Sequence, residues 1–352
     1  MGKYNLFLES GYLDFESIVN TANTPFTYII GARGVGKTYG AFSYCLKNKL
    51  KFIYMRRQQI DIDKIVTPTL NPIKSIARDL NRNIEVLPVS KKTYGFFEGT
   101  YTDKGDFIPE SEPLGIAVAL STVQNLRGFD ATDYKVLFYD EFIPETHSRP
   151  IKEEFCAFCN AIETIARNRE LNGGEPLRVY CCSNSNVLCN PYFVGMGVVH
   201  SVYNMTKSGQ SVCKFPDLDT TIINLNRSPI SEQKRNTSLY RMSRNSTFSN
   251  MAIDNSYSVD ETRCKMVNFK EYSPECEIGE ICIYVHKKSG KYHISATTAG
   301  TPLNRYAMTE YDKQAFRADY VGLYLTLKTT REITFDSPVE EQYLLNLFEE
   351  NT

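Results

Sequence analysis

The chain lacks several features by which a sequence is often assigned at once. It has no apolar run long enough to cross a bilayer, and it does not open with a basic and then apolar leader. We therefore expect a soluble, intracellular protein with no membrane partner. The net charge is only −1, so overall charge neither indicates nor excludes a nucleic-acid partner. Internal repeats and low-complexity tracts are also missing, and 42% hydrophobic with 23% charged residues indicate a globular fold.

Residue spacings typical of metal sites are scarce as well. The ten cysteines are scattered, and many lie inside apolar segments, which indicates reduced core residues and not disulfides. Cys156 and Cys159 form a single CxxC within a helical pattern, without a second well-spaced pair or a nearby histidine. Structural zinc sites require four such ligands, so the sequence does not favour zinc here.

The most informative segment is residues 31–38, which has the form of a phosphate-binding (Walker A) loop. A short apolar segment of strand character, 26–30, precedes it, and residues 39–46 follow with helical spacing. Glycines let backbone N–H groups surround a polyphosphate, and the new helix directs its positive end at the same anion. A chance glycine-rich turn would lack this strand and helix, so nucleotide binding is favoured. The predicted ligands of the nucleotide are Gly31, Ala32, Arg33, Gly34, Val35, Gly36, Lys37 and Thr38.

An acidic pair further along the chain supports this interpretation. Lys37 would reach the β- and γ-phosphates of ATP, and Thr38 would offer its hydroxyl to Mg²⁺. The apolar run 134–139 ends in Asp140 and Glu141, a Walker B pattern. An acid at the end of a buried strand can hold Mg²⁺ opposite Thr38, and the second acid can polarise a water. This pair favours hydrolysis over kinase chemistry, although a solvated acidic pair is the simpler alternative.

The alternation of apolar and helical stretches predicts the architecture. It indicates a mainly parallel sheet with helices on both faces and ligands at the carboxyl ends of the strands. We expect this domain to span residues 1–215, with a polar, proline-broken, lid-like insertion at about 60–110. The predicted strands are 26–30, 51–55, 114–120, 134–139 and 177–182.

Composition changes after residue 215. Residues 216–258 are rich in Asn, Ser, Thr and Arg, which predicts a linker that could hold a short helical bundle. From 259 to 352 strand patterns return, with a hairpin signal at 281–296. Segments 312–325 and 338–350 have helical patterns, so the sequence predicts a small α+β domain there.

Charge and helical periodicity add two weaker signals. Residues 227–244 hold five basic residues against one acid, as expected of an anion-facing surface or of ordinary solvated charge. In the predicted helix 150–169, Arg167 lies opposite the apolar face. Such an arginine can act as a finger in a neighbouring subunit's site, or it can simply be solvated near a helix end.

Several strings together resemble the DNA-packaging motor ATPases of small short-tailed bacteriophages with protein-primed DNA replication. Their order and spacing match across about residues 20–200. The resemblance implies an α/β P-loop NTPase of the ASCE type, followed by a small α+β domain similar to a vestigial nuclease of the RNase H type. The matching strings are 30–38, 52–57, 136–143, 164–169, 182–184 and 190–193.

The resemblance also implies a function. A homo-oligomeric ring, with five subunits as the expected number, would use ATP and Mg²⁺ to drive double-stranded DNA through the portal of an empty viral capsid. The protein would reside in the host cytoplasm and transiently at the portal vertex, and a structural RNA is an open further partner. The alternatives are another P-loop DNA motor, such as a helicase or a terminase with an active nuclease, and a non-catalytic ATP-binding module that binds the portal.

The resemblance assigns residue roles. Lys37 and Thr38 bind phosphate and Mg²⁺, Asp140 holds Mg²⁺, Glu141 activates water, and Arg167 is the trans-acting arginine finger.

Three further positions come from the same resemblance. Asn184, in a Ser-Asn pair at the end of a central strand, would sense the γ-phosphate. Arg127 loosely matches a basic position that acts across the interface. Gln59 stands where the family has a lid lysine, so a lid finger is not expected from this position.

The C-terminal segment matches the family weakly. Its candidate first strand, residues 263–269, holds no acid, and Glu271, Asp312 and Asp319 are spread along the chain. Because a two-metal nuclease requires clustered carboxylates, we do not expect nuclease activity.

Overall fold

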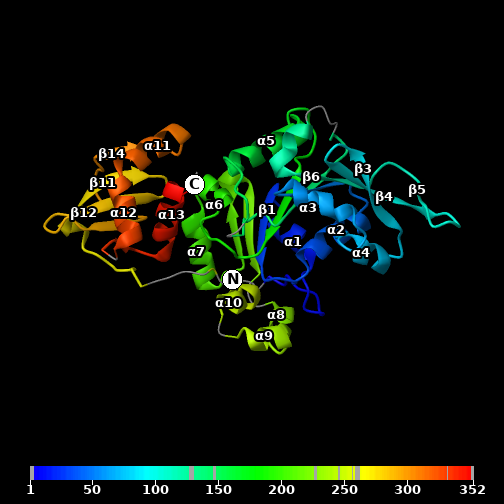
Figure 1. Ribbon diagram of the computed structural model, residues 1–352, viewed down its shortest axis with the longest axis horizontal. Helices are drawn as coiled ribbons and strands as arrows, with labels where there is room; N and C mark the ends of the chain where they lie inside the picture. The colour runs from blue at the N-terminus through cyan, green and yellow to red at the C-terminus, as the bar shows by residue number, and fades with distance from the viewer. Residues whose placement is uncertain are drawn as a thin grey trace. The chain divides into compact units, whose positions relative to one another are not determined.

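The computed structural model describes residues 4–349 apart from a few short gaps, and it divides the chain into two compact units (Figure 1). The first unit comprises residues 1–186 and 205–257, and the second comprises 187–204 and 258–352. Within the described residues, no helix is both long and apolar enough to cross a membrane. The gaps are 127–130, 146–147, 226–227, 245, 256, 258–261 and 331.

A large, mostly parallel sheet forms the centre of the first unit. Its strand order is β3-β4-β6-β2-β7-β8-β1-β10-β9, and the run from β6 to β10 is parallel throughout. Each predicted strand is present within one or two residues, so the predicted sheet is confirmed. The parallel strands are β1 (Phe26–Gly31), β2 (Phe52–Arg56), β6 (Gly115–Ala119), β7 (Val136–Asp140), β8 (Arg178–Ser183) and β10 (Thr220–Leu225).

Helices cover both faces of this sheet, which is why its strands are apolar almost without alternation. On one face, Ile29 belongs to a buried cluster that includes Phe42 of the helix following the P-loop. On the other face, the ring of Tyr139 stacks on Phe158 of α5, with centroids 5.4 Å apart. The helices of this part are α1 (Phe15–Ala22), α2 (Lys37–Lys47), α3 (Gln59–Asp63), α4 (Lys74–Asp79) and α5 (Glu154–Ala166), with 3-10 turns at Lys64–Val66 and Leu120–Leu126.

The insertion at about 60–110 does not form the separate lid-like subdomain that the sequence predicted. It contains the hairpin β3 (Ile84–Ser90) and β4 (Thr93–Tyr101), together with β5 (Phe107–Pro109), and β4 pairs antiparallel with β6. The insertion therefore extends the main sheet. The reason is hydrophobic: Phe96 of β4 is fully buried against Phe42 and Phe52.

The segment predicted as a linker, 216–258, is also built differently. β10 pairs with β1 in parallel and with β9 (Val212–Phe215) antiparallel, so the sheet continues beyond residue 215. Every residue of β10 is buried, although Thr221 and Asn224 made this strand look polar. A group of short helices then follows, as the sequence allowed. These helices are α8 (Pro229–Lys234), α9 (Ser238–Met242) and α10 (Thr247–Asp254).

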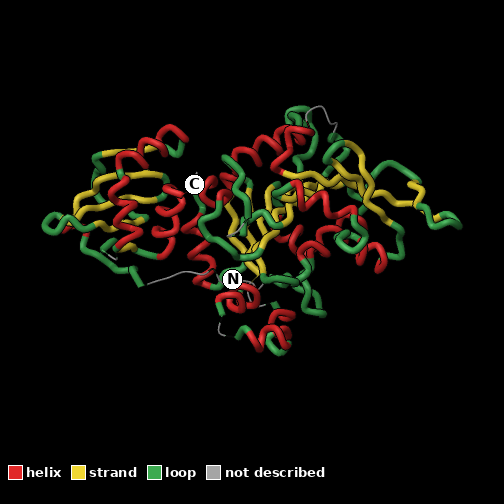
Figure 2. The backbone as a smooth tube through the Cα atoms, in the orientation of Figure 1, coloured by secondary structure: helices red, strands yellow, loops and turns green. Residues whose placement is uncertain are grey.

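The second unit joins residues 187–204 to the C-terminal part of the chain. Figure 2 shows that both units contain helices and strands. Its sheet has the order β14-β11-β12-β13-β15. The predicted hairpin is confirmed as β12 and β13, whereas the helical segment 312–325 is two helices, α11 and α12. The elements are α6 (Pro191–Met196), α7 (Val199–Ser208), β11 (Tyr272–Ile278), β12 (Ile281–His286), β13 (Tyr292–Ser295), β14 (Asn304–Tyr306), α11 (Glu310–Asp319), α12 (Val321–Thr329), β15 (Thr334–Phe335) and α13 (Pro338–Glu349).

The predicted first strand at 263–269 is wrong. Within the described residues, its only pairing with the sheet is an isolated bridge between Cys264 and Phe335, and the first strand of the sheet is β11. None of its residues is buried, and Met266 is 94% exposed. Phe269, at its end, packs on the buried ring of Tyr284, with centroids 4.8 Å apart, but most of the segment lacks the burial that would hold it in the sheet.

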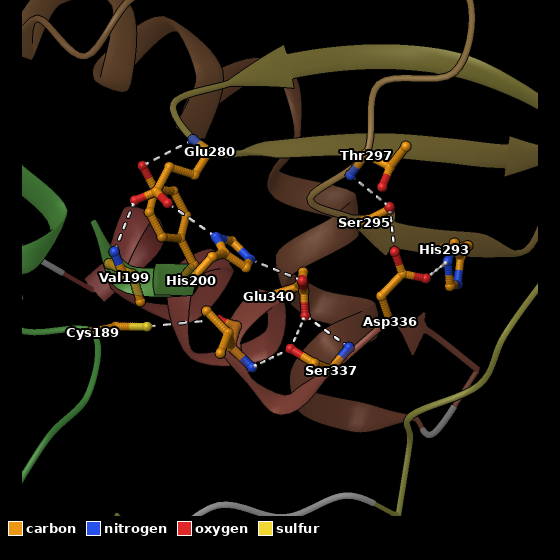
Figure 3. A network of polar contacts seen from close by, with 12 residues as sticks. Cys189, Val199, His200, Glu280, His293, Ser295, Thr297, Asp336, Ser337 and Glu340 are labelled. Carbon is orange, nitrogen blue, oxygen red and sulfur yellow. Dashed lines mark hydrogen bonds and ion pairs between the residues drawn. The ribbon is translucent and has the colours of Figure 1, made fainter. Parts of the chain in front are cut away.

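A half-buried histidine, His200, links α7 to the rest of the second unit (Figure 3). The Nδ1 atom of His200 lies 3.0 Å from Oε2 of Glu280, and its Nε2 atom lies 2.9 Å from Oε1 of Glu340. Glu340 also accepts hydrogen bonds from the backbone N–H and hydroxyl of Ser337, which forms a capping box at the start of α13. Burial alone would lower the pKa of His200, but the two carboxylates outweigh it and raise this pKa to about 9.

This raised pKa predicts a pH-dependent stability. A group with a higher pKa in the folded state stabilises fully below its unfolded pKa, here 6.5, and loses that effect as pH rises through about 9. We expect the His200 contribution, on the order of 2–3 kcal/mol, to disappear over this window. Urea unfolding of wild type and His200→Gln at about pH 6 and pH 9.5 measures it. His286→Gln is the control, because His286 has a similar exposure but, within the described residues, only one carboxylate partner, that of Glu271, at 3.7 Å. A stability difference between wild type and His200→Gln that is the same at both pH values would contradict the charged network.

Candidate functional site

The P-loop adopts the geometry that its sequence predicts. β1 ends at Gly31 and α2 begins at Lys37. Gly34 and Gly36 have φ values of 66° and 96°, a left-handed conformation that glycine adopts at little cost. The N-terminal segment braces the loop, because the N–H of Leu13 donates to the carbonyl of Val35 over 2.9 Å. The backbone is therefore preformed to receive an anion at the start of α2.

Lys37 is buried beneath this loop. Its ammonium donates to the carbonyls of Gly31 and Ala32 at 2.7 and 3.0 Å, and to Oδ1 of Asn184 at 3.1 Å. Burial lowers the pKa of Lys37 to about 8, against the opposing effect of nearby anionic groups. The structure thus brings Asn184, from the end of β8, to the predicted phosphate-binding lysine.

Thr38 and Asp140 also meet as the sequence predicted. The hydroxyl of Thr38 donates to Oδ2 of Asp140 over 3.0 Å. The same carboxylate oxygen accepts a hydrogen bond from the hydroxyl of Tyr54 at 3.3 Å. A hydroxyl at the start of α2 and a carboxylate at the end of β7 provide hard oxygen donors, the type that Mg²⁺ prefers.

Glu141 follows directly at the end of β7 in a strained conformation. Its φ of 54° is unusual for a residue with a side chain, and such strain is concentrated at functional sites. Burial raises the pKa of Glu141, and an ion pair with the guanidinium of Arg56 opposes that rise. Glu141 lines a cavity of about 190 Å³ together with Arg56, Asn184 and Asn186.

Sequence reasoning missed two residues of this cavity. Arg56 entered the sequence analysis only as part of the string 52–57, and its contact with Glu141 joins positions 85 residues apart. Asn186 was not singled out at all. Within the described residues its Oδ1 atom is buried without a hydrogen-bond partner, so a residue that lines the cavity carries an unsatisfied acceptor. The repeated Ser-Asn pattern at 183–186 was the available signal.

A buried ion pair connects the end of β2 to α5. Nε and Nη2 of Arg57 contact the two carboxylate oxygens of Glu154 at 2.6 and 2.7 Å, and both residues are buried. The neighbouring residue, Arg56, contacts Glu141. Two consecutive arginines at the end of β2 therefore contact two elements: Arg56 contacts the residue that follows β7, and Arg57 contacts the first residue of α5.

We expect Glu154→Gln to destabilise the protein by about 3 kcal/mol, because it leaves the charge of Arg57 buried without its partner. Urea unfolding measures the loss. The half-exposed pair of Arg82 and Glu98 supplies a matched control, since Glu98→Gln should cost about 1 kcal/mol or less. Replacing both Arg57 and Glu154 with leucine should recover much of the loss, and equal losses in Glu154→Gln and Glu98→Gln would contradict the assignment.

Arg167 lies at the end of α5, away from any described partner. α5 is shorter than the predicted helix 150–169, because Glu153, Arg167 and Asn168 are all left-handed. The side chain of Arg167 is exposed, and within the described residues no hydrogen bond or ion pair involves its guanidinium. Arg169 instead donates to the carbonyls of Tyr134 and Ala131 and fixes this end of the helix. The geometry leaves Arg167 accessible to a second molecule.

Comparison with known proteins now decides the family. Residues 10–315 match the family model described as Podovirus DNA encapsidation protein (Gp16). The chain belongs to this family. The DNA packaging protein of Bacillus phage phi29 is 25% identical over 311 residues, which cover 85% of this chain and 81% of that protein. The chain is thus a phage DNA-packaging protein, as its motifs indicated.

Solved structures share the fold of this encapsidation protein. A chain of the bacteriophage Phi-29 viral genome packaging motor assembly has a TM-score of 0.63 at 20% identity, with 98% of this chain and 99% of that chain covered. A chain of the Phi-28 gp11 DNA packaging motor has a TM-score of 0.62 at 17% identity, with 96% and 98% covered. At these identities the likeness concerns the fold alone, and it extends over both units.

Two further residues named in the sequence analysis, Gln59 and Arg127, do not contribute to the described site. Gln59 occupies the place of the lid lysine and is fully engaged: its side chain donates to Asp63 and to the carbonyl of Lys92, and it accepts from Thr122. It is a local structural residue. Arg127 lies outside the described residues. A larger cavity of about 790 Å³ lies within the insertion and includes none of the predicted site residues.

Proposed function

We propose that this encapsidation protein is an ATPase that couples ATP hydrolysis to the transport of double-stranded DNA into a preformed capsid. One observation carries the proposal: the P-loop, the Thr38–Asp140 pair and Glu141 converge at the carboxyl ends of β1 and β7. This is the set of groups that P-loop hydrolysis requires. The similar proteins are a DNA packaging protein and a viral genome packaging motor, which supports DNA transport as the process that ATP hydrolysis drives.

Each residue of the site has a separate role in the proposed hydrolysis. The P-loop N–H groups and Lys37 bind the phosphates, and Lys37 exchanges its bonds to Gly31 and Ala32 for phosphate oxygens. Thr38 and Asp140 would hold Mg²⁺, which neutralises developing charge on the phosphates when bound. Glu141 takes the proton of the attacking water, and its strained backbone keeps the carboxylate at the cavity.

The cavity beside Glu141 has groups to position that water. Asn184 and Asn186 line it, and Asn184 contacts Lys37 directly. Because a carboxamide can both donate and accept, Asn184 can bind the γ-phosphate while Asn186 orients water. Asn184 would then report the presence of the γ-phosphate to the end of β8.

We infer a ring of identical subunits in which Arg167 completes the site of its neighbour. Its exposed guanidinium and its position at the end of α5 support this role. A permanent, planar positive charge suits a phosphoryl transition state. We propose five subunits at the portal vertex of a capsid in the host cytoplasm, with a structural RNA as an optional further partner.

The second unit supports an RNase H-like ancestry without nuclease chemistry. β11, β12 and β13 form an antiparallel meander, and β14 pairs parallel with β11, which is the RNase H arrangement for the first four strands. β14 contains Asn304, Arg305 and Tyr306 and no acid. Glu277 of β11 pairs with Arg305 at 3.3 Å. We therefore propose a DNA motor that does not cut.

Two assays separate this proposal from its alternatives. ATP hydrolysis measured with and without double-stranded DNA should show turnover that DNA stimulates, whereas a non-catalytic portal-binding module would show none. Incubation of DNA with Mn²⁺ should leave it intact, whereas a terminase with a working nuclease would cut it. Absence of ATP turnover in the assembled protein would overturn the proposed function.

Lys37→Ala should weaken ATP binding by on the order of 100-fold, because the site loses about 3 kcal/mol of charge-assisted hydrogen bonding to phosphate. Titration with a fluorescent ATP analogue measures the affinity. Lys47→Ala, an exposed lysine at the other end of α2, is the matched control and should bind like wild type. Unchanged affinity in Lys37→Ala would contradict the assignment of the P-loop.

A further inference from the structure

The short helices α8–α10 enclose a basic pocket that the ATPase chemistry does not use. The pocket has a volume of about 320 Å³ and lies in the first unit. Its floor includes buried Ser249 and Ile253. It combines three guanidinium groups, one carboxamide and one phenol in a single concave surface. The residues that line it are Arg235, Asn236, Tyr240, Arg241, Arg244, Ser249 and Ile253.

The charges in this pocket are only partly compensated. Arg235 pairs with Glu232 at 2.8 Å, but within the described residues no ion pair involves Arg241 or Arg244. The ring of Tyr240 stacks on Phe248, with centroids 6.0 Å apart and planes 10° apart, which stiffens one wall. Guanidinium forks match phosphate oxygens in geometry and charge. The pocket therefore has the chemistry of a phosphate-binding site.

The same segment touches the P-loop. Lys234, the last residue of α8, donates from its ammonium to the carbonyl of Arg33 at the tip of the loop. A Cβ atom added at Gly34 would lie 2.5 Å from that ammonium, so the lysine lies directly against the loop. Ser228 anchors the start of α8 by donating to the carbonyl of Gly11 over 3.3 Å. Lys234 and pocket residue Arg235 are adjacent in the chain, so one short segment both contacts the loop and lines the pocket.

We propose that the α8–α10 arginine pocket binds backbone phosphates of a nucleic-acid duplex, and that Lys234 couples this binding to the nucleotide in the P-loop. The inference rests on the proposed function and names one place where the motor holds its DNA. ATP changes the charge and hydrogen bonding around the P-loop tip, so the position of Lys234 differs in energy with and without ATP. A contact with such a differential energy is what coupling between two sites requires.

Salt-dependent binding tests the pocket. Anisotropy of a labelled DNA duplex, titrated at several salt concentrations, should give a steep slope for wild type. Arg241→Ala with Arg244→Ala removes two phosphate contacts, so the slope should fall by roughly 1.8 and the affinity by about tenfold or more. Arg241→Lys with Arg244→Lys keeps the charges and should keep the slope. Lys104→Ala with Lys288→Ala, which removes two exposed lysines elsewhere, is the charge-matched control.

The outcomes separate this inference from the proposed function. Wild type that binds no DNA would overturn the proposed function itself. A steep wild-type slope that the two alanines leave unchanged, with affinity for an ATP analogue intact, would overturn only the pocket. A duplex RNA of the same length distinguishes the polymer: a parallel loss for RNA and DNA indicates backbone phosphates alone, and a loss for DNA alone indicates that duplex geometry contributes.

A second measurement tests the coupling. The DNA affinity of wild type should change by about fivefold or more when a non-hydrolysable ATP analogue is added. Lys234→Met should retain DNA binding but bring this ratio close to one. Gln233→Met, at the neighbouring exposed position of α8, should behave like wild type. The same ratio in wild type and Lys234→Met would overturn the coupling role of Lys234.

Discussion

Glu141→Gln is expected to bind ATP normally and to lose ATP turnover by roughly 10²–10⁴-fold. An amide has the shape of the carboxylate but cannot take a proton from water, and general-base catalysis contributes about this factor. The P-loop, Lys37 and Thr38 are untouched by the substitution, so binding should persist. Single-turnover hydrolysis and titration with a fluorescent ATP analogue measure the two effects separately.

Glu145→Gln is the matched control for this variant. Glu145 lines the same cavity and is about as exposed as Glu141, but it lies away from the end of β7 and pairs with Arg33, so its loss should change turnover little. Because burial raises the pKa of Glu141, the acidic limb of the wild-type pH–rate profile should lie above the range of an ordinary carboxyl. Hydrolysis by Glu141→Gln at the wild-type rate would remove Glu141 from the role of base.

The nucleotide site could be predicted from sequence because its signals are local. The strand before Gly31, the glycines and the helix after Lys37 are contiguous, and each follows its own periodicity or conformational rule. The pairing of Thr38 with Asp140 follows from one further rule, that parallel strands end at the same edge. The proximity of Thr38 and Asp140 could therefore be predicted without knowledge of other side-chain contacts.

The remaining parts depend on packing between distant segments. β10 contains Thr220, Thr221 and Asn224, which read as polar, yet the strand is buried because it pairs with β1. Conversely, residues 263–269 were predicted as a strand but make only an isolated bridge to the sheet, and none of them is buried. The local sequence pattern cannot distinguish these cases, because tertiary contacts determine whether a segment joins the sheet.

Side-chain networks are harder still to predict. The contacts of Arg56 with Glu141 and of Arg57 with Glu154 join one strand end to two elements more than 80 residues away. Either arginine alone reads as a solvated cation. Only the assembled sheet shows that one orients the proposed base and the other anchors α5, the helix that carries Arg167.

Arg167→Ala is expected to retain ATP binding and to lower turnover in the assembled ring by roughly 10³–10⁵-fold, the effect of an arginine finger in a related phosphoryl transfer. The P-loop is unchanged, so the affinity for ATP should match wild type. Lys152→Ala, which removes an exposed cation just before α5, is the control and should hydrolyse normally. An Arg167→Ala rate equal to wild type would mean that Arg167 is only a solvated helix-end residue.

Mixing two inactive variants tests whether Arg167 acts across the subunit interface. Subunits with Arg167→Ala keep Glu141, and subunits with Glu141→Gln keep Arg167, so some interfaces of a mixed ring contain both groups. Hydrolysis should therefore reappear when the variants are titrated against each other at fixed total protein on DNA. An arginine that works within its own subunit gives no such recovery, since every site then lacks one group. If native mass measurement shows mixed rings and hydrolysis stays absent, the trans role of Arg167 is wrong.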